Sequence, residues 1–252
     1  MRFTKLTLTL AFAGLILTSS ARGGSITIDI TTRGATGLGN GAWYIQTDPQ
    51  PTGTGVIQPF VRIQNRFTES GYNTDYRPVE FDTKDQNQWT HALNIADVPI
   101  VTYLGGQYRQ FLLDINEGGN TTLQQLSLNE VEIYLGPTNL EHNYPNLGTK
   151  IYTLDTSGKD RTVELNYKLN SGSGSGDMFL LVPNSLFTGP NQWVYLYSNF
   201  GIPNGSDAGF EEWAVLQANN PPPGEGVVPL PAVAWGGLAL FGGLGMNRRR
   251  RF

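Results

Sequence analysis

The stretch Ser25-Ile26-Thr27-Ile28-Asp29-Ile30 indicates the fold, because apolar β-branched residues alternate in it with polar ones. A period of two puts the isoleucines on one face of a β-strand and the polar side chains on the other. Comparable runs recur at 56–63, 108–115, 126–135, 162–169, 178–182, 193–197 and 213–217. We therefore expect a body that is built of many short strands.

The segments between these runs carry residues that favour turns. Gly, Asn, Pro, Ser and Asp gather at 37–40, 48–55, 118–120, 171–176 and 203–209. We find no amphipathic helix longer than about two turns and no repeat of fixed period. This pattern predicts an all-β domain over 24–218, an antiparallel β-sandwich of the jelly-roll-like kind, flanked by an N-terminal signal helix and a short hydrophobic C-terminal helix.

The composition limits what this body does. Seven of the basic residues lie outside 24–227, which leaves that part with 10 Lys or Arg against 21 Asp or Glu and a net charge of −11. An acidic body argues against nucleic acid as a partner, because nucleic-acid binding needs a basic surface. The chain has no cysteine, so thiol catalysis and cysteine-bound zinc are excluded, and no disulfide holds the domain together.

The N-terminus has the layout of a secretory signal peptide. A short basic region precedes the apolar run 6–17, and small residues follow it. We expect signal peptidase to cut after Ala21 or Gly23, which makes 1–23 the signal peptide. An uncleaved membrane anchor is the alternative, but the apolar run is short for that role.

The C-terminus has three parts in a fixed order after a Pro- and Gly-rich linker at 219–227. They are Val228-Pro229-Leu230-Pro231-Ala232, an uncharged run of 15 residues at 232–246, and Arg248-Arg249-Arg250-Arg251. A helix of 15 residues is about 22 Å long, whereas a comfortable membrane span needs about 20 residues. We expect a short transmembrane helix that holds the body temporarily, with the arginines on the cytoplasmic side.

This tail, at 228–252, resembles the PEP-CTERM class of bacterial sorting signals, and more narrowly its VPLPA-CTERM variant. The resemblance implies recognition by an exosortase-type membrane protease that cuts near the proline motif. It also implies a Gram-negative envelope and a link to exopolysaccharide and biofilm. The expected route is an inner-membrane-anchored precursor with its body in the periplasm, and then release to the cell surface or extracellular matrix.

The body is similar to uncharacterised β-sandwich domains of exported proteins that bear such tails. The segments that carry this similarity are 111–116, 126–131, 172–178 and 209–213. The similarity implies a shared fold and no particular activity.

The chain offers few residues for catalysis, so we expect a protein that is not an enzyme. It has two histidines, no Gly-x-Ser-x-Gly sequence and no His-Glu-x-x-His sequence. The best acidic pair is Glu211-Glu212, but neighbours on a strand point to opposite faces, whereas glycosidase carboxyl groups face each other. We expect one of these glutamates to be solvated and the other to be salt-bridged.

A structural calcium ion is the one cofactor that the sequence suggests. Asp114, Asn116 and Asn120 place oxygen ligands at alternating positions near a glycine turn, as at the start of an EF-hand loop. The match is partial, because Gly118 occupies the fifth position and Gln125 the twelfth. We therefore expect no cofactor, and a structural calcium ion at this turn is the alternative.

Aromatic residues suggest a glycan-binding surface. Trp43 follows a Gly-rich segment, and Trp89 is surrounded by polar residues, so Trp89 is the tryptophan that we most expect to be partly exposed. Large aromatic side chains lie more often in the core.

Three functions remain open on the sequence alone. The first is a non-enzymatic surface or matrix protein that acts in adhesion or biofilm assembly. The second is a carbohydrate-binding module for exopolysaccharide, and the third is a glycan-modifying enzyme.

Overall fold

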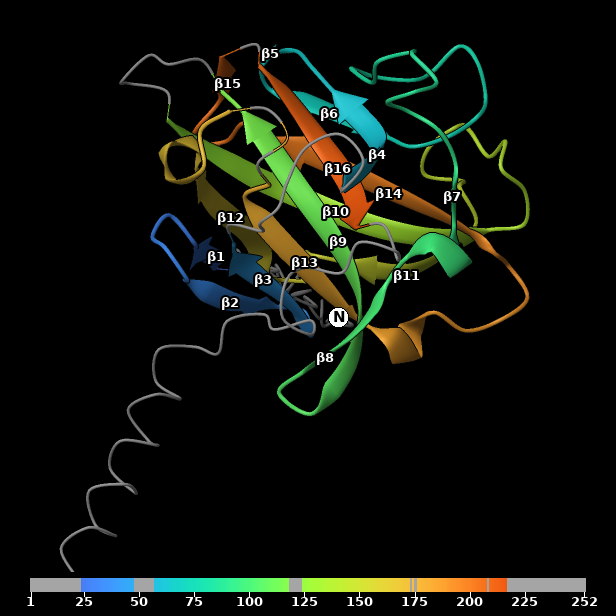
Figure 1. Ribbon diagram of the computed structural model, residues 1–252, viewed down its shortest axis with the longest axis horizontal. Coiled ribbons are helices and arrows are strands. Elements are labelled where there is room, and N and C mark those ends of the chain that lie inside the picture. Colours follow the sequence, from blue (N-terminus) through green and yellow to red (C-terminus); the bar gives the residue numbers. More distant parts are fainter. Residues whose placement is uncertain are drawn as a thin grey trace, which may run out of the picture.

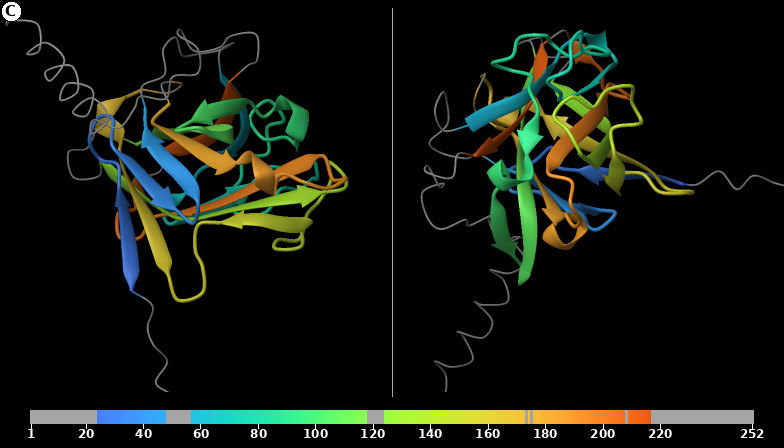
Figure 2. Two further views of the ribbon diagram at one scale, coloured as in Figure 1. Left: turned by 90° about the horizontal axis from the view of Figure 1, so that it is seen from below. Right: turned by 90° about the vertical axis from the view of Figure 1, so that its right-hand side faces the viewer.

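The computed structural model describes residues 24–47, 57–117, 124–172, 174, 176–207 and 209–216. The predicted signal peptide, linker and sorting signal lie outside these residues, as do Asn120 and the arginine cluster. The described part is mostly β-structure, as the sequence predicts, with two larger sheets and one small sheet. The two larger sheets face each other as two layers (Figures 1 and 2).

The first sheet has the strand order β1-β12-β10-β14-β6, with β11 paired to β10 and β7 paired to β14. Its strands are β1 (Ser25–Asp29), β12 (Asp160–Asn166), β10 (Gln125–Gly136), β14 (Trp193–Phe200), β6 (Glu69–Tyr72), β11 (Thr149–Thr153) and β7 (Leu93–Asn94). Every pair is antiparallel except β1 and β12, which are parallel. The prediction of a wholly antiparallel sheet was therefore wrong at β1. The reason is that β1 pairs with a strand far along the chain, and no hairpin dictates its direction.

The second sheet is antiparallel throughout and has the order β2-β3-β13-β9-β16-β4, with β8 paired to β9. Its strands are β2 (Thr36–Gly39), β3 (Ala42–Gln46), β13 (Met178–Pro183), β9 (Gly106–Asn116), β16 (Phe210–Leu216), β4 (Ile57–Ile63) and β8 (Ile100–Tyr103). A small sheet of β5 (Arg66–Phe67) and β15 (Ser206–Asp207) lies at one end of the molecule (Figure 1). The short 3₁₀ helices are η1 (Ile95–Asp97), η2 (Tyr167–Leu169) and η3 (Asn184–Leu186).

One apolar core fills the space between the two larger sheets, because inward-facing residues from both sheets belong to a single cluster. Trp213 of β16 is fully buried in it, and its Nε1 donates a hydrogen bond of 3.0 Å to Ser198 Oγ of β14 in the opposite sheet. A buried indole N–H without a partner is costly, so this bond satisfies the donor and ties the two sheets together.

The first strand, β1, packs closely against β2. Ile28 is buried, and a Cβ at Gly37 would lie 2.3 Å from Ile28 Cγ2. A glycine at position 37 therefore makes room for the isoleucine that anchors β1.

We expect Ser198→Ala to lower the free energy of unfolding by about 1–3 kcal/mol, because it leaves the buried Nε1 of Trp213 without an acceptor. Urea denaturation measures the change. Ser157→Ala, in an exposed turn, is the matched control and should change the stability by less than about 0.5 kcal/mol. Equal effects of the two variants would contradict a stabilising role for the bond.

Candidate functional site

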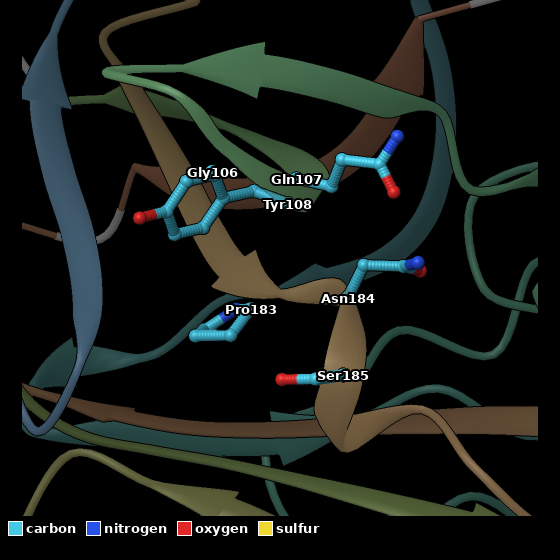
Figure 3. A pocket seen from close by; sticks show the side chains of 6 residues that line it. All are labelled: Gly106, Gln107, Tyr108, Pro183, Asn184 and Ser185. Atoms are coloured by element: carbon cyan, nitrogen blue, oxygen red, sulfur yellow. The ribbon is translucent and has the colours of Figure 1, made fainter.

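A surface depression of about 460 Å³ lies where the β8–β9 hairpin meets the end of β13 and η3. Six residues line it, namely Gly106, Gln107, Tyr108, Pro183, Asn184 and Ser185 (Figure 3). Binding sites for small ligands and sugars are concave and combine apolar rings with a few polar groups. The depression has this composition.

The backbone places Tyr108 across the base of the hairpin. Pro183 pairs with Tyr108 in the sheet. The two-residue turn at Leu104 and Gly105 has positive φ at both positions, 47° and 82°, as a tight hairpin turn requires. A Cβ at Gly106 would lie 2.8 Å from the Tyr108 ring, so the ring lies directly over this glycine.

Polar side chains complete the lining, on the side of the depression away from the Tyr108 ring (Figure 3). Gln107 and Ser185 are exposed, and the side chains of Gln107 and Asn184 end on the same side of the depression (Figure 3). Arg109 Nε donates to Asn184 Oδ1 at 3.2 Å, which fixes the orientation of that amide. The lining of the depression therefore includes one aromatic ring and several amide and hydroxyl groups, and sugar-binding sites use both kinds of group.

Trp43, one of the two predicted glycan-binding residues, lies close to this depression. The rings of Trp43 and Tyr103 are 5.4 Å apart in an edge-to-face arrangement, and those of Tyr103 and Tyr108 are 6.4 Å apart. The hydroxyl of Tyr103 is buried and has no hydrogen-bond partner among the described residues. Burial, and secondarily Tyr108, raises the pKa of Tyr103. The three rings form one aromatic cluster, and its member Tyr108 lines the depression.

Trp89, the other predicted residue, lies elsewhere. It is half-buried, which confirms the prediction of partial exposure. The Arg62 guanidinium carbon lies 3.9 Å from the centre of the Trp89 ring and 4.1 Å from that of Phe210. Because β13, β9 and β16 separate β3 from β4, Trp43 and Trp89 do not form one binding platform.

The predicted calcium ligands Asp114 and Asn116 occupy the last part of β9 rather than a loop. Asp114 is fully buried and accepts a hydrogen bond from the backbone N–H of Gly174. Burial raises the pKa of Asp114 to about 6. Asn116 Oδ1 accepts a bond of 3.4 Å from the Tyr167 hydroxyl. The third predicted ligand, Asn120, lies outside the described residues, so calcium binding there stays a prediction.

The glutamates of the Glu211-Glu212 pair point to opposite faces of β16. Glu212 forms a salt bridge of 2.7 Å with Arg62 Nε, as expected for one member of the pair. The expectation that the other is solvated was wrong, because Glu211 is 0% exposed. Its side chain faces the interior between the sheets, where Glu69 and Glu117 meet it.

The sequence reasoning missed a group of acidic and aromatic residues on the outer face of the first sheet. Glu132 accepts hydrogen bonds from the hydroxyls of Tyr134 and Tyr144 and forms a salt bridge with Lys150. Glu130 lies two residues earlier on the same face of β10, and burial raises its pKa to about 7. The period-two spacing at 130, 132 and 134 was the signal that could have pointed to this group.

Both histidines make local contacts within the fold. His91 contacts backbone carbonyls with both ring nitrogens, and His142 stacks on Tyr76 at 3.7 Å. Across the described ranges, no group of three or more His, Asp or Glu side chains is arranged to hold a metal ion. Within those same ranges, no helix has the length and apolar character needed to cross a membrane.

Comparison with known proteins gives no match among family models, curated proteins or solved structures.

The pKa of Glu130 predicts a pH dependence of stability. Folded Glu130 keeps its proton up to about pH 7, whereas the unfolded side chain loses it near its ordinary value of 4.5. The stability that protonated Glu130 contributes is therefore fully present below pH 4.5 and is lost as the pH rises through about 7. Glu130→Gln cannot lose a proton. From pH 5 to pH 8, the wild type should lose about 1–2 kcal/mol more of its free energy of unfolding than Glu130→Gln loses, after allowance for solvent screening.

Urea denaturation at the two pH values measures this difference. An identical fall in both proteins would contradict the assignment of the titration to Glu130.

Proposed function

We propose that this chain is an exported, non-enzymatic surface or matrix protein that an exosortase-type system processes. The observation that carries the proposal is the tail, in which the motif Val228-Pro229-Leu230-Pro231-Ala232 precedes an uncharged run and four arginines. The N-terminal signal and the acidic body support the same route. The body, a jelly-roll-like sandwich, stays in the periplasm while the precursor is held in the inner membrane. It then reaches the cell surface or the extracellular matrix and acts in adhesion or biofilm assembly.

The chemistry of the described residues supports a role without catalysis. Glu211 and Glu212 diverge, and both histidines engage in local contacts. A glycan-modifying enzyme needs two carboxyl groups that converge on an open cleft, and the depression at Tyr108 has no carboxyl group in its lining.

The second candidate is a carbohydrate-binding module that acts on exopolysaccharide. One observation favours it: the same concave surface is lined by Tyr108, which lies over Gly106, and by the polar residues Gln107, Asn184 and Ser185. An adhesive matrix protein that binds its own polysaccharide would join both candidates in one molecule.

Processing tests the first proposal. Replacing Pro229 and Pro231 with alanine should leave the full-length form in the membrane fraction, because the motif that the protease recognises is lost. Immunoblots of membrane and medium measure this. The matched control replaces Pro221 and Pro222 of the linker and should not change release. Unchanged release of the Pro229 and Pro231 variant would count against a cleaved sorting signal.

Sugar binding tests the second candidate. Tyr108→Ala should weaken binding to the cell's own exopolysaccharide by at least about tenfold, which corresponds to roughly 1.4 kcal/mol. Gly106→Ala should weaken binding as well, because the added Cβ displaces the Tyr108 ring. Titration calorimetry measures the affinity. Tyr144→Ala removes a half-buried tyrosine outside the depression, and binding should survive it. No binding by the wild-type protein, or loss only in Tyr144→Ala, would rule out the depression.

A further inference from the structure

Three glutamates from distant parts of the chain meet between the two larger sheets. Glu69 begins β6, Glu117 directly follows β9, and Glu211 is the second residue of β16. Their exposed fractions are 1%, 2% and 0%. The carboxyl group of Glu211 contacts those of both other residues. We refer to these three residues as the interior glutamate cluster.

Strand register directs two of the side chains inward. Glu69 pairs with Phe200 and Glu211 pairs with Ile115, and both partners belong to the apolar core. Because paired residues point to the same face, the two glutamates approach each other from opposite sheets.

Tight backbone packing brings the third glutamate to the same point. A Cβ at Gly209 would lie 1.6 Å from the carbonyl oxygen of Asn116, so a glycine at position 209 lets the start of β16 approach the end of β9. Glu117 comes directly after Asn116. The small sheet of β5 and β15 lies at this end of the molecule (Figure 1).

Backbone donors hold only one oxygen on each of two carboxyl groups. Asn65 N–H donates to Glu69 Oε2 at 2.6 Å, and Asp207 N–H donates to Glu117 Oε2 at 2.7 Å. Four other oxygens are buried without a donor in the described part of the chain: Glu69 Oε1, Glu117 Oε1 and both oxygens of Glu211. The Glu211 carboxyl group contacts the other two, and contacts between ionised carboxylates are repulsive unless a positive charge or a proton lies between them.

The surrounding charges do not supply that positive charge. Lys84 attracts Glu69, but Asp82 repels Glu69 and Asp207 repels Glu117. Burial raises the pKa values of Glu69 and Glu211 and brings that of Glu117 to about 8. The cluster therefore holds protons when nothing else neutralises it.

We propose that Glu69, Glu117 and Glu211 bind a divalent cation of the calcium class. Oxygen-only ligands with several carboxylates suit Ca²⁺, whereas zinc prefers nitrogen and sulfur. The site differs from the predicted Asp114 loop, because the Asp114 side chain lies on the outer face of β9 beside Glu212.

In the structure the three carboxyl groups contact one another instead of surrounding an ion. A calcium ion at about 2.3–2.6 Å from each oxygen would separate them. Rotation of the side chains supplies this movement, because no backbone N–H of the described residues holds the Glu211 carboxyl group and each of the other two is held by a single backbone N–H.

The test uses the purified protein after treatment with EDTA, at pH 7.5. Thermal unfolding and titration calorimetry are measured with CaCl₂. At a hundredfold excess over Kd, calcium should raise Tm by roughly 5–10 °C. Glu211→Gln should abolish both the shift and the binding heat. This variant keeps the side-chain shape without a charge, so it should fold in EDTA.

Two matched variants separate this site from its neighbours. Glu212→Gln changes the adjacent, outward-facing glutamate and should keep the calcium shift. Asp114→Asn changes the predicted loop and should also keep it. Should Glu211→Gln fail to fold, Glu117→Gln with terbium luminescence gives the same comparison. The proposal is overturned if the wild type does not bind calcium, if Glu211→Gln binds it equally well, or if only Asp114→Asn loses it.

Discussion

The alternation of side chains along β16 is the constraint on which the rest of the structure depends. Glu211 and Trp213 face the interior, and Glu212 faces outward to Arg62. Trp213 fills the core and reaches Ser198 in the opposite sheet. The same register that buries this indole also forces a glutamate into the interior. The packing of Trp213 and the burial of Glu211 therefore both follow from the register of β16.

The proposed sugar-binding depression and the interior glutamate cluster lie in different parts of this framework. The depression at Tyr108 lies where the β8–β9 hairpin, which extends from the sheet, meets the end of β13 and η3 (Figure 1). The interior glutamate cluster lies near the opposite end of β9, where that strand, β6 and the start of β16 converge. A cation there would tie both sheets together without disulfides, which this cysteine-free chain cannot form.

Much of the β-structure could be predicted from local patterns, and the sites could not. The run at 126–135 matches β10, and that at 178–182 matches β13, because period-two alternation is a local signal. The pair β2 and β3 was missed, since a Gly-rich segment masks the alternation there. Glu69, Glu117 and Glu211 are far apart in the chain, and no spacing rule connects them.

The sequence by itself determined the strand-rich body, its acidic charge and the absence of disulfides, because these follow from composition and local periodicity. It also carries the sorting motif, from which the export route is proposed. Only the tertiary structure decided that β1 pairs in parallel, that Trp43 joins Tyr103 and Tyr108, and that Glu211 is buried. Each of these depends on which distant strands become neighbours, and that choice is made by the packing of the whole core.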